Sequence, residues 1–419
     1  MADGRVLLIC YYFPPLGGAG VGRPLTLFRR LSDFGYTCDV LTVKPVAYRF
    51  YEKELLADLD KARIYRSGSR DPQRIMYLLG MRKIKDSTIS RGKKVSDRFF
   101  PDPKIGWVKP AINLGRVLIE NKNYSCIVST SPPISTHLIG MKLAGEFNLP
   151  WIADFRDFWT GYKAEDWFVS RSQIEKAQSL LKTITDAASA VTVTNPAIAD
   201  YLGRGEVIHN SFDEDRARLW GRPQREHFVI GVLGTIDELR PVEPLLKLVA
   251  ALKAKAPHAY ERVRIMQVGH VNLDSLDSLL EQYDLKERCD RRGFLPREET
   301  VRCLSASSML YIGLDSTFGK GIVPGRLFDM IASGRPILAA VDRDGEVARL
   351  VKETGNGIGF DDDNFDECVE YLVSAIDSHA REESNCRPGP PYAAKYSSSA
   401  MTKRFADLIT RISEKSPAT

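Results

Sequence analysis

Short apolar runs alternate with amphipathic stretches along both halves of the chain, and this alternation restricts the possible folds strongly. In the first half, residues 6–13 are typical of a buried strand and residues 23–35 of an amphipathic helix that ends at a glycine. The second half repeats this order with a strand at 227–234, a helix at 243–256 and a strand at 264–269. Strands that are separated by helices form parallel sheets with helices on their faces. The sequence therefore predicts an α/β protein with two Rossmann-like units.

Length and linker composition place the domain boundary. At 419 residues the chain exceeds what one hydrophobic core normally supports. A polar stretch at 213–225 separates the two series of strands and helices. We expect a first domain at 1–213 and a second at 214–394, followed by a last amphipathic helix within 395–419.

The composition excludes several classes of protein. With 43% hydrophobic and 27% charged residues it is typical of a globular protein, and no apolar run approaches the roughly 18–20 residues that span a bilayer. The N-terminal apolar run leads into Pro14-Pro15 and a glycine loop, so we interpret it as a first strand and not as a signal peptide. Seven scattered cysteines without a CxxC pair indicate reduced thiols in a cytoplasm, and they predict no metal site.

The net charge of +5 is concentrated in one segment. Residues 70–98 contain nine Lys or Arg against three Asp, so the rest of the chain is nearly neutral. Two interpretations stay open: a solvated basic face, or a patch that contacts an anionic membrane surface or an anionic acceptor. No motif typical of nucleic-acid binding accompanies the segment, so nucleic acid is not an expected partner.

A glycine loop at 17–20 directly follows the first strand and precedes a helix. Backbone amides in such a loop can bind an anion. The loop is not a dinucleotide fingerprint, because Arg23 stands where the third glycine belongs and no acidic residue ends the next strand. It is not a P-loop either, since the GK[ST] sequence is missing. A tight turn and a site that a phosphate or sugar approaches remain as alternatives.

Two polar motifs follow strands in the first half, SPPISTHLIG at 131–140 and DFRDFW from Asp154. Both belong to the carboxyl edge of the expected sheet, where open α/β sheets bind ligands. Arg156 and Asp157 therefore indicate a binding role together with Asp154, although an internal Arg–Asp ion pair would explain two of the three. His137 lies within an apolar helix, which favours a packed histidine over a ligand-binding one.

In the second half, Gly234-Thr235 ends a strand, and Arg240 stands in the loop before the next helix. An arginine in that loop can bind a phosphate with two parallel hydrogen bonds, or it can be an ordinary surface residue.

The segment 318–339 carries the strongest indication of a ligand. Pro324-Gly325 opens a helix, and the first amides of a helix carry partial positive charge. Asp329 lies about one helical turn after Arg326, on the same face. Amides and cations suit a diphosphate, and a nearby carboxylate suits the hydroxyls of a ribose. The expected positive groups are the amides of Gly325, Arg326 and Leu327 and the side chains of Lys320 and Arg326.

Six motifs in register now support a family resemblance. The loop at 11–22, the segment VIHNSFDED at 207–215, the turn RRGFLPREE at 291–299 and the segment DMIASGRPIL at 329–338 follow one another in a known order. With them, the chain resembles the retaining, nucleotide-sugar-dependent glycosyltransferases of family four, which have the GT-B fold. ADFRDFW and SPPISTHLIG resemble a bacterial subgroup associated with surface-polysaccharide and glycolipid assembly.

The resemblance implies the architecture, and the chain departs from the family pattern at two positions. It implies two Rossmann-like domains that face a central cleft, with the helix of 395–419 crossing back to the first domain. The family commonly has two glutamates seven residues apart in the late signature. Here Asp329 stands in the place of the second and Gly321 in the place of the first.

The resemblance also implies roles for individual residues. The second domain would bind the donor and the first the acceptor, and positively charged groups would neutralise the departing diphosphate without a metal. The expected catalytic residues are Arg156, Asp157, Arg240 and Arg326, with Asp157 as the base if the protein supplies one. The expected donor-binding residues are Gly18, Gly20, Gly234, Thr235, Arg240, Phe294, Lys320, Gly325, Arg326, Leu327 and Asp329. The expected acceptor-binding residues are Ser131, His137 and Asp154.

The implied activity is a retaining, hexosyltransferase-like transfer from a nucleotide-diphosphate sugar, with a UDP-sugar favoured, to a hydroxyl acceptor. It would serve polysaccharide, glycolipid or other glycoconjugate synthesis, and no cofactor is expected. A GT-B sugar-nucleotide epimerase and a non-catalytic sugar-nucleotide-binding scaffold are the alternatives. We expect a cytoplasmic protein. The segment 70–98 is compatible with a lipid-linked acceptor and a peripheral position on the inner face of the cell membrane.

Overall fold

Parallel strands form two sheets in the structure, a computed structural model that describes residues 4–47, 51–80, 99–159, 170–316, 320–381, 383 and 389–414. The chain divides into two units. Unit 1 comprises Met1–His209 and Ser399–Thr419, and unit 2 comprises Asn210–Ser398. The boundaries expected from the sequence were 213/214 and 394/395.

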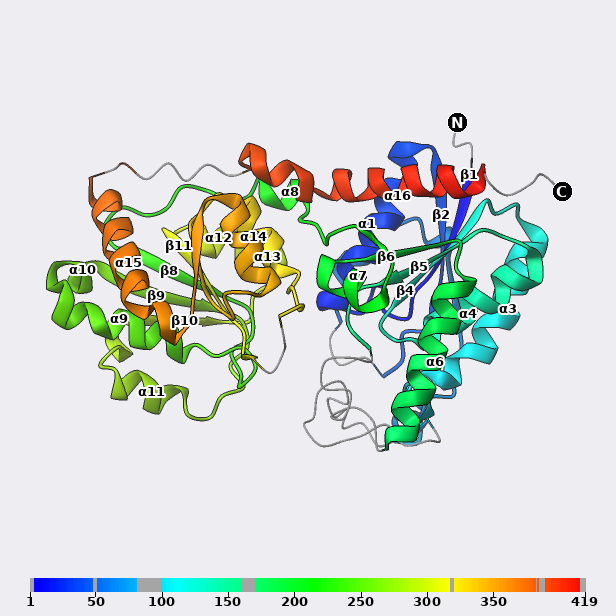
Figure 1. Cartoon of the computed structure of the whole chain (residues 1–419), viewed down its shortest axis with the longest axis horizontal. Helices are drawn as coiled ribbons and strands as arrows, with labels where there is room; N and C mark the ends of the chain where they lie inside the picture. The colour runs from blue at the N-terminus through cyan, green and yellow to red at the C-terminus, as the bar shows by residue number, and fades with distance from the viewer. Residues whose placement is uncertain are drawn as a thin grey trace. The chain divides into compact units, whose positions relative to one another are not determined.

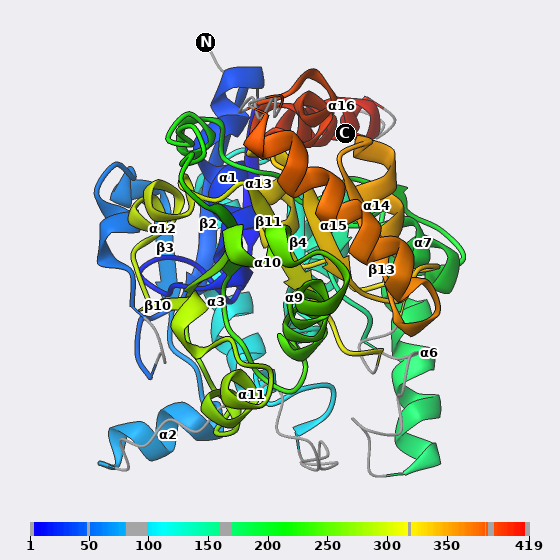
Figure 2. The same ribbon diagram turned by 90° about the vertical axis from the view of Figure 1, so that its left-hand side faces the viewer.

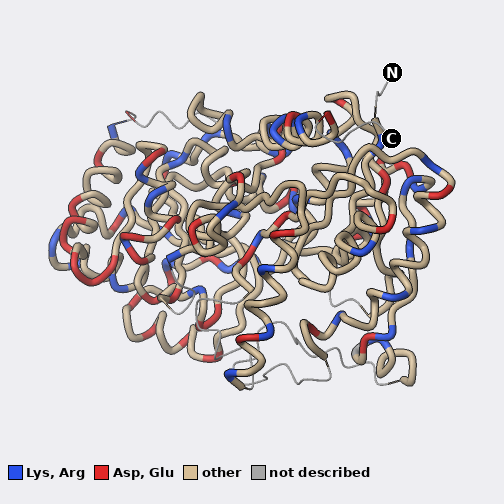
Figure 3. Tube along the Cα trace, turned by 45° about the vertical axis from the view of Figure 1, so that its right-hand side comes forward, with Lys and Arg blue, Asp and Glu red and all other residues tan. Residues whose placement is uncertain are grey.

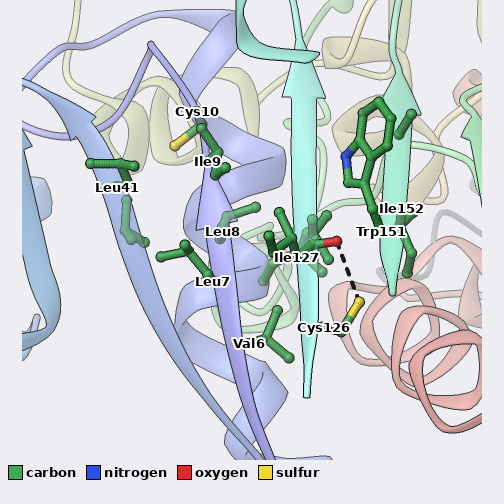
Figure 4. Close-up of a cluster of buried hydrophobic side chains, with 14 of the residues drawn as sticks. Val6, Leu7, Leu8, Ile9, Cys10, Leu41, Cys126, Ile127, Trp151 and Ile152 are labelled. Carbon is green, nitrogen blue, oxygen red and sulfur yellow. Dashed lines mark hydrogen bonds between the residues drawn. The ribbon is translucent and has the colours of Figure 1, made fainter. Parts of the chain in front are cut away.

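Unit 1 is built on a seven-stranded parallel sheet in the order β3-β2-β1-β4-β5-β6-β7 (Figure 1). Every residue of β1 from Val6 to Ile9 is buried, and Figure 4 shows these side chains beside Leu41 and Ile127 of the neighbouring strands β2 and β4. Both faces of the sheet are therefore core, as the unbroken apolar runs predicted. The strands are β1 (Gly4–Ile9), β2 (Tyr36–Val43), β3 (Ile64–Ser67), β4 (Cys126–Ser131), β5 (Trp151–Phe155), β6 (Ala190–Val193) and β7 (Glu206–Val207).

Helices connect these strands, and two of the predicted boundaries can be compared directly. The helix expected at 23–35 starts at Gly22, continues as a 3-10 turn to Phe34 and ends at Gly35, where φ is 87°. The strand expected at 6–13 ends at Ile9, because the chain turns away before Pro14-Pro15, which cannot donate to a ladder. The helices of unit 1 before its last are α1 (Gly22–Arg30), α2 (Pro72–Leu78), α3 (Val108–Asn121), α4 (Ser135–Phe147), α6 (Arg171–Ala187) and α7 (Pro196–Leu202).

The last helix, α16 (Ser398–Ser413), packs on unit 1 although the residues before it belong to unit 2. Its side chains Met401, Phe405 and Ile409 are buried in the core of unit 1. Arg411 forms an ion pair with Glu206 of the edge strand β7. This arrangement confirms the expected return of the C-terminal helix to the first domain.

Unit 2 is built on a six-stranded parallel sheet in the order β10-β9-β8-β11-β12-β13. Helices α9, α10 and α15 contact one another (Figure 2). The strands are β8 (Phe228–Leu233), β9 (Val263–Val268), β10 (Cys289–Gly293), β11 (Met309–Gly313), β12 (Ile337–Ala340) and β13 (Gly357–Phe360). The helices are α8 (Glu214–Ala217), α9 (Glu243–Lys255), α10 (Pro257–Arg262), α11 (Leu276–Gln282), α12 (Arg297–Leu304), α13 (Arg326–Ala332), α14 (Glu346–Thr354) and α15 (Phe365–Ala380).

Each sheet reverses its strand order at one place. In unit 1 the reversal lies between β1 and β4, and in unit 2 it lies between β8 and β11. Open α/β sheets bind ligands beyond the carboxyl ends of the strands at such a reversal. The loops that follow these four strands are therefore the places to look for a site in each unit.

Charge and hydropathy agree with a globular chain over the part that the structure describes. Cationic and anionic residues are interspersed along the trace (Figure 3). No described helix combines the length and the apolar character needed to cross a bilayer. Of the basic segment expected at 70–98, residues 81–98 lie outside the described residues.

A fully buried arginine holds unit 2 together at a point that the sequence did not reveal. Arg335 is 1% exposed, and its guanidinium lies 4.6 Å from the ring centroid of Trp220. It donates to four backbone carbonyl oxygens, those of Ser305, Ser307, Gly221 and Ser333, at 2.7, 2.7, 2.9 and 3.3 Å. Arg335 thus ties the start of unit 2 to the residues that precede β11.

We expect Arg335→Met to destabilise unit 2 by roughly 3 kcal/mol, because buried carbonyl oxygens lose their donors. The measurement is urea unfolding followed by hydrogen exchange of the peptides that contain β11 and β12. Arg343→Met is the control, since that side chain is 44% exposed and its loss costs no more than about 0.5 kcal/mol. Equal midpoints for the two variants would contradict this role of Arg335.

Candidate functional site

The glycine loop of unit 1 lies between β1 and α1, beside the reversal of the strand order. Gly18 has φ 92°, which a side chain would strain. Its amide donates to a carboxylate oxygen of Glu52 at 2.9 Å. A Cβ atom on Gly17 would lie 2.2 Å from the same oxygen, so Glu52 packs directly against the loop. The loop is therefore a defined turn whose conformation requires glycine.

Arg156, after β5, fixes this loop to the loop after β4. Its guanidinium donates to the carbonyl oxygens of Ser131 at 2.6 Å and Gly20 at 2.7 Å. The backbone oxygen of Arg156 accepts a hydrogen bond from Thr194 at 2.8 Å. Burial lowers the pKa of the guanidinium from its ordinary value, and the neighbouring Asp157 opposes this effect. Arg156 is thus a positioning residue that connects Gly20 with the SPP segment.

Asp154 is a structural residue and not the acceptor-binding one that the sequence suggested. It is fully buried, and its two carboxylate oxygens accept hydrogen bonds from Nη2 and Nε of Arg23, at 2.8 and 3.0 Å. Thr130 and Thr192 donate to the same carboxylate, each at 2.7 Å. These four hydrogen bonds occupy both of its oxygens. The internal ion pair that the sequence analysis considered exists, but its arginine is Arg23 and not Arg156.

His137 and Ser131, the other expected acceptor-binding residues, are also held in the core. His137 is fully buried, its Nδ1 lies 2.8 Å from the Ser129 hydroxyl, and its ring lies 4.4 Å from the ring of Phe155. Burial lowers its pKa to about 3, so the imidazole is neutral. The Ser131 side chain is 2% exposed. Of the polar side chains expected at this edge, Asp157 is the exposed one.

The reversal in unit 2 brings together three of the expected donor-binding residues. Gly234 follows β8 with φ 97°, and Thr235 comes after it. A Cβ atom on Gly234 would lie 2.5 Å from a terminal nitrogen of Arg326, so the guanidinium lies on the bare backbone of Gly234. Arg240, in the same loop as Gly234, forms an ion pair with Asp237 at 2.6 Å.

Arg326 is a cation without a counterion among the described residues. It forms no hydrogen bond or ion pair there, and its Nε atom is buried without an acceptor. Burial and the repulsion of Arg240 lower the pKa of Arg326 to about 10, while Asp237 opposes them. A guanidinium that is desolvated, repelled and unpaired is the arrangement that an anionic ligand would relieve.

Two details of the expected diphosphate site require correction, those of Leu327 and Lys320. The Leu327 amide is not free, because it donates to the Pro324 carbonyl oxygen at 3.0 Å. Lys320 lies 3.1 Å from Asp344 and 3.6 Å from Asp342, so its ammonium already has two carboxylate neighbours. Gly325 precedes α13 as its N-cap and is exposed.

Asp329, expected to hold a ribose, forms an ion pair with Arg216 of α8 at 2.8 Å. Both side chains are partly exposed, at 27% and 20%. A ligand hydroxyl would therefore meet a carboxylate and a guanidinium, and not a lone carboxylate.

An aromatic stack lies at the carboxyl end of β9 and β10. The rings of His270 and Phe294 are nearly parallel, with centroids 4.8 Å apart and an angle of 12° between their planes. Phe294 is 58% exposed, so one face of this stack is open to a planar ligand.

Sequence reasoning missed Asp237, Glu52 and Arg216. Asp237 stands three residues before Arg240, a spacing that could have indicated a local ion pair. Glu52 and Arg216 have partners 34 and 113 residues away, and no local pattern reveals such pairs. Within the described ranges, no group of three His, Cys, Asp or Glu side chains could hold a metal ion.

The pKa of His137 predicts a pH dependence of the stability of unit 1. The unfolded chain binds a proton near pH 6.5, whereas the folded chain does so only near pH 3, as burial dictates. Folding is therefore most stable above pH 6.5 and loses about 1.4 kcal/mol per pH unit between these values. Urea unfolding at pH 7 and pH 5 should show that His137→Gln reduces this loss. His258→Gln, at an exposed position, should leave it unchanged, and equal losses in all three proteins would contradict the assignment.

Comparisons with known proteins fit this architecture. No protein-family profile and no curated protein sequence matches the chain. Sucrose-phosphate synthase from Thermosynechococcus elongatus superposes with a TM-score of 0.65 at 14% identity, over 99% of this chain and 100% of that one. The lipopolysaccharide outer core galactosyltransferase WaaB gives a TM-score of 0.59 at 12% identity, over 97% and 99%.

A putative UDP-N-acetylglucosamine 2-epimerase from Listeria monocytogenes also superposes, with a TM-score of 0.56 at 12% identity, over 99% of this chain and 98% of that one. At such identities the likenesses establish the fold alone. They agree with the two parallel sheets of seven and six strands. The chain has the GT-B fold.

Proposed function

We propose that the protein transfers a sugar from a nucleotide-diphosphate sugar to a hydroxyl acceptor. The observation that carries the proposal is Arg326, a partly buried side chain that has no counterion among the described residues and lies on the backbone of Gly234, close to Arg240. Several solved structures with the same fold are described as glycosyltransferases, among them WaaB and WaaG.

The ligand of this cluster is proposed to be a diphosphate. Two guanidiniums against one carboxylate, Asp237, leave a net positive charge in a partly buried place. A guanidinium matches the geometry of phosphate oxygens with two parallel hydrogen bonds. As the sugar departs, negative charge grows on the diphosphate, and preorganised cations there would lower the barrier without a metal.

The nucleoside would lie beside the same cluster in unit 2. The open face of Phe294 offers a stacking surface to the base, and Asp329 with Arg216 offers an acceptor and donors to the ribose. A UDP-sugar is the favoured donor, since related folds include a TarM complex with UDP.

The acceptor would bind to unit 1, at the carboxyl edge of the sheet beside the glycine loop. Asp157 is exposed there and is our candidate for a protein-supplied base, while Arg156 holds the loop in place. We propose a retaining outcome, as the sequence resemblance implies. Positioning of the acceptor hydroxyl against the donor would supply much of the rate enhancement.

Epimerisation of a sugar nucleotide is the second candidate, because an epimerase shares the fold at a TM-score of 0.56. Both activities need a diphosphate site. Product analysis distinguishes them, since an epimerase changes the sugar nucleotide without any acceptor.

We also propose a peripheral contact with an anionic membrane, which would suit a lipid-linked acceptor in polysaccharide or glycolipid synthesis. Four exposed apolar side chains gather on and after α2: Ile75, Met76, Leu78 and Leu79, at 44, 46, 71 and 73% exposure. The residues that follow in the sequence, 81–98, carry seven Lys or Arg against two Asp. Apolar and basic residues together suit an anionic bilayer surface.

The other face of α2 is firmly anchored. Asp71 caps the helix by accepting from the Arg74 amide at 3.1 Å, and it also accepts from the hydroxyls of Tyr11 and Ser69, each at 2.8 Å. Arg74 is 4% exposed, and Lys104 lies 3.7 Å from Asp71. A helix held by such a buried polar cluster presents its apolar residues in a fixed place.

Arg326→Ala should weaken UDP binding roughly 10- to 100-fold, because a charge-assisted contact to the diphosphate is lost. Isothermal titration calorimetry measures the effect. Arg264→Ala, at the amino end of β9, is the matched control and should bind UDP like the wild type. Unchanged UDP affinity in Arg326→Ala would refute the diphosphate assignment.

Leu78→Ser combined with Leu79→Ser should reduce binding to vesicles that contain phosphatidylglycerol by tenfold or more, roughly the loss expected for two leucines that no longer enter the interface. Co-sedimentation measures the effect. Val117→Ser is the control, because Val117 is 52% exposed on α3 but stands alone. If the double variant and the control bind equally well, α2 is not the contact.

A further inference from the structure

The two arginines of the unit 2 cluster are unequally neutralised. Arg240 is paired with Asp237 at 2.6 Å, whereas Arg326 has no counterion among the described residues. Arg240 lies in the loop after β8, and Arg326 is the first residue of α13, which follows β11, so both belong to the strand-order reversal between β8 and β11. An anion that enters would therefore find one cation free and the other engaged.

Asp237 is held in place independently of Arg240. One carboxylate oxygen accepts from the Leu239 amide at 3.1 Å, and the other accepts from the Arg240 guanidinium at 2.6 Å. The backbone closes the same turn, because the Arg240 amide donates to the Asp237 carbonyl oxygen at 3.0 Å. The carboxylate therefore keeps one hydrogen bond when the guanidinium leaves.

The ion pair of Arg240 with Asp237 lies at a partly exposed position. Arg240 is 31% exposed, and Asp237 is 22% exposed, so the pair lies at the surface of the cluster. Arg326, by contrast, lies on Gly234, where a Cβ atom would be 2.5 Å from its guanidinium. The cation without a counterion among the described residues thus lies against the backbone of Gly234, and the paired cation has its counterion at a partly exposed position.

We propose that Asp237 is a displaceable counter-charge, which holds Arg240 while the site is empty and yields it to the anionic ligand. The inference rests on the proposed function, since the ligand is taken to be a diphosphate. Asp237 does not touch the reacting atoms and acts through Arg240, so it is a positioning residue.

The exchange has a direct consequence for affinity. Binding must replace the Asp237–Arg240 contact, which offsets part of the gain from the new contact between Arg240 and the ligand. The carboxylate that remains also repels the ligand anion. When the product diphosphate leaves, the ion pair between Asp237 and Arg240 forms again, which favours release.

The test uses Asp237→Asn in the full-length protein, with inorganic pyrophosphate and UDP as probes in isothermal titration calorimetry. The amide oxygen keeps the contact with the Leu239 amide but removes the charge. We expect both probes to bind roughly three- to tenfold more tightly. We also expect affinity to fall more steeply with salt, since the site carries one more net positive charge.

A purely structural role of Asp237 makes the opposite prediction, because a damaged loop weakens binding. Unchanged or weaker binding by Asp237→Asn would overturn the inference. Glu238→Gln, which removes a neighbouring exposed carboxylate, should leave both affinities unchanged. In the Arg240→Ala background, Asp237→Asn should lose most of its effect, and a full effect there would also overturn the inference. Asp237→Glu should restore affinity close to that of the wild type.

The outcomes separate this inference from the proposed function. Pyrophosphate lacks the base and the sugar, so its affinity reports on the arginine cluster alone. If the wild type binds neither probe, both the function and the inference fail. If the wild type binds UDP but Asp237→Asn shows no gain, the inference alone fails.

Discussion

The ion pair between Arg23 and Asp154 is the contact on which the carboxyl edge of the sheet in unit 1 depends. Arg23 stands at the start of α1, directly after the glycine loop, and Asp154 belongs to β5. The same guanidinium donates to the carbonyl oxygens of Ile208 and His209, and it lies 4.9 Å from the ring centroid of Phe405 in α16. Burying two charges is costly, and here every carboxylate oxygen is satisfied, which makes the pair tolerable. Removing either partner would leave the other charge buried and alone.

Arginines with buried guanidinium atoms differ in how they are paired among the described residues. Arg23, Arg156 and Arg335 each donate to several oxygens and serve to connect segments that are distant in sequence. Arg326 is desolvated as well, yet no described acceptor lies within reach of its guanidinium. Arg262 also has a buried Nε without an acceptor, so what distinguishes Arg326 is its place on Gly234 and close to Arg240, at the strand-order reversal of unit 2. The same comparison explains why Arg156 is a positioning residue and not a group that faces a substrate.

Local periodicity predicted the architecture, because apolar strands that alternate with amphipathic helices form a parallel sheet with helices on its faces. Short edge strands were not predicted: β10 consists of Cys-Asp-Arg-Arg-Gly, whose charged side chains suit an edge and resemble a loop. In the candidate site, Gly234, Arg240 and Arg326 were expected to bind the donor, and they lie near one another because strand ends and helix starts meet at one edge of the sheet. The role of Asp154 was wrong, because its partner Arg23 lies 131 residues away and no local pattern links them. The ion pair of Asp329 with Arg216 escaped prediction for the same reason.

The return of α16 to unit 1 sets an order of events during synthesis. The chain leaves the ribosome from its N-terminus, and domains generally fold as units while synthesis continues. Unit 1 cannot complete its core in this way, because Met401 and Phe405 contact Arg23 and emerge only after all of unit 2. While unit 2 is being synthesised, unit 1 therefore remains incomplete, and Arg23 and the apolar surface that α16 covers stay exposed. A chain that ends before α16 therefore lacks part of the core of unit 1, even when all of unit 2 has been made.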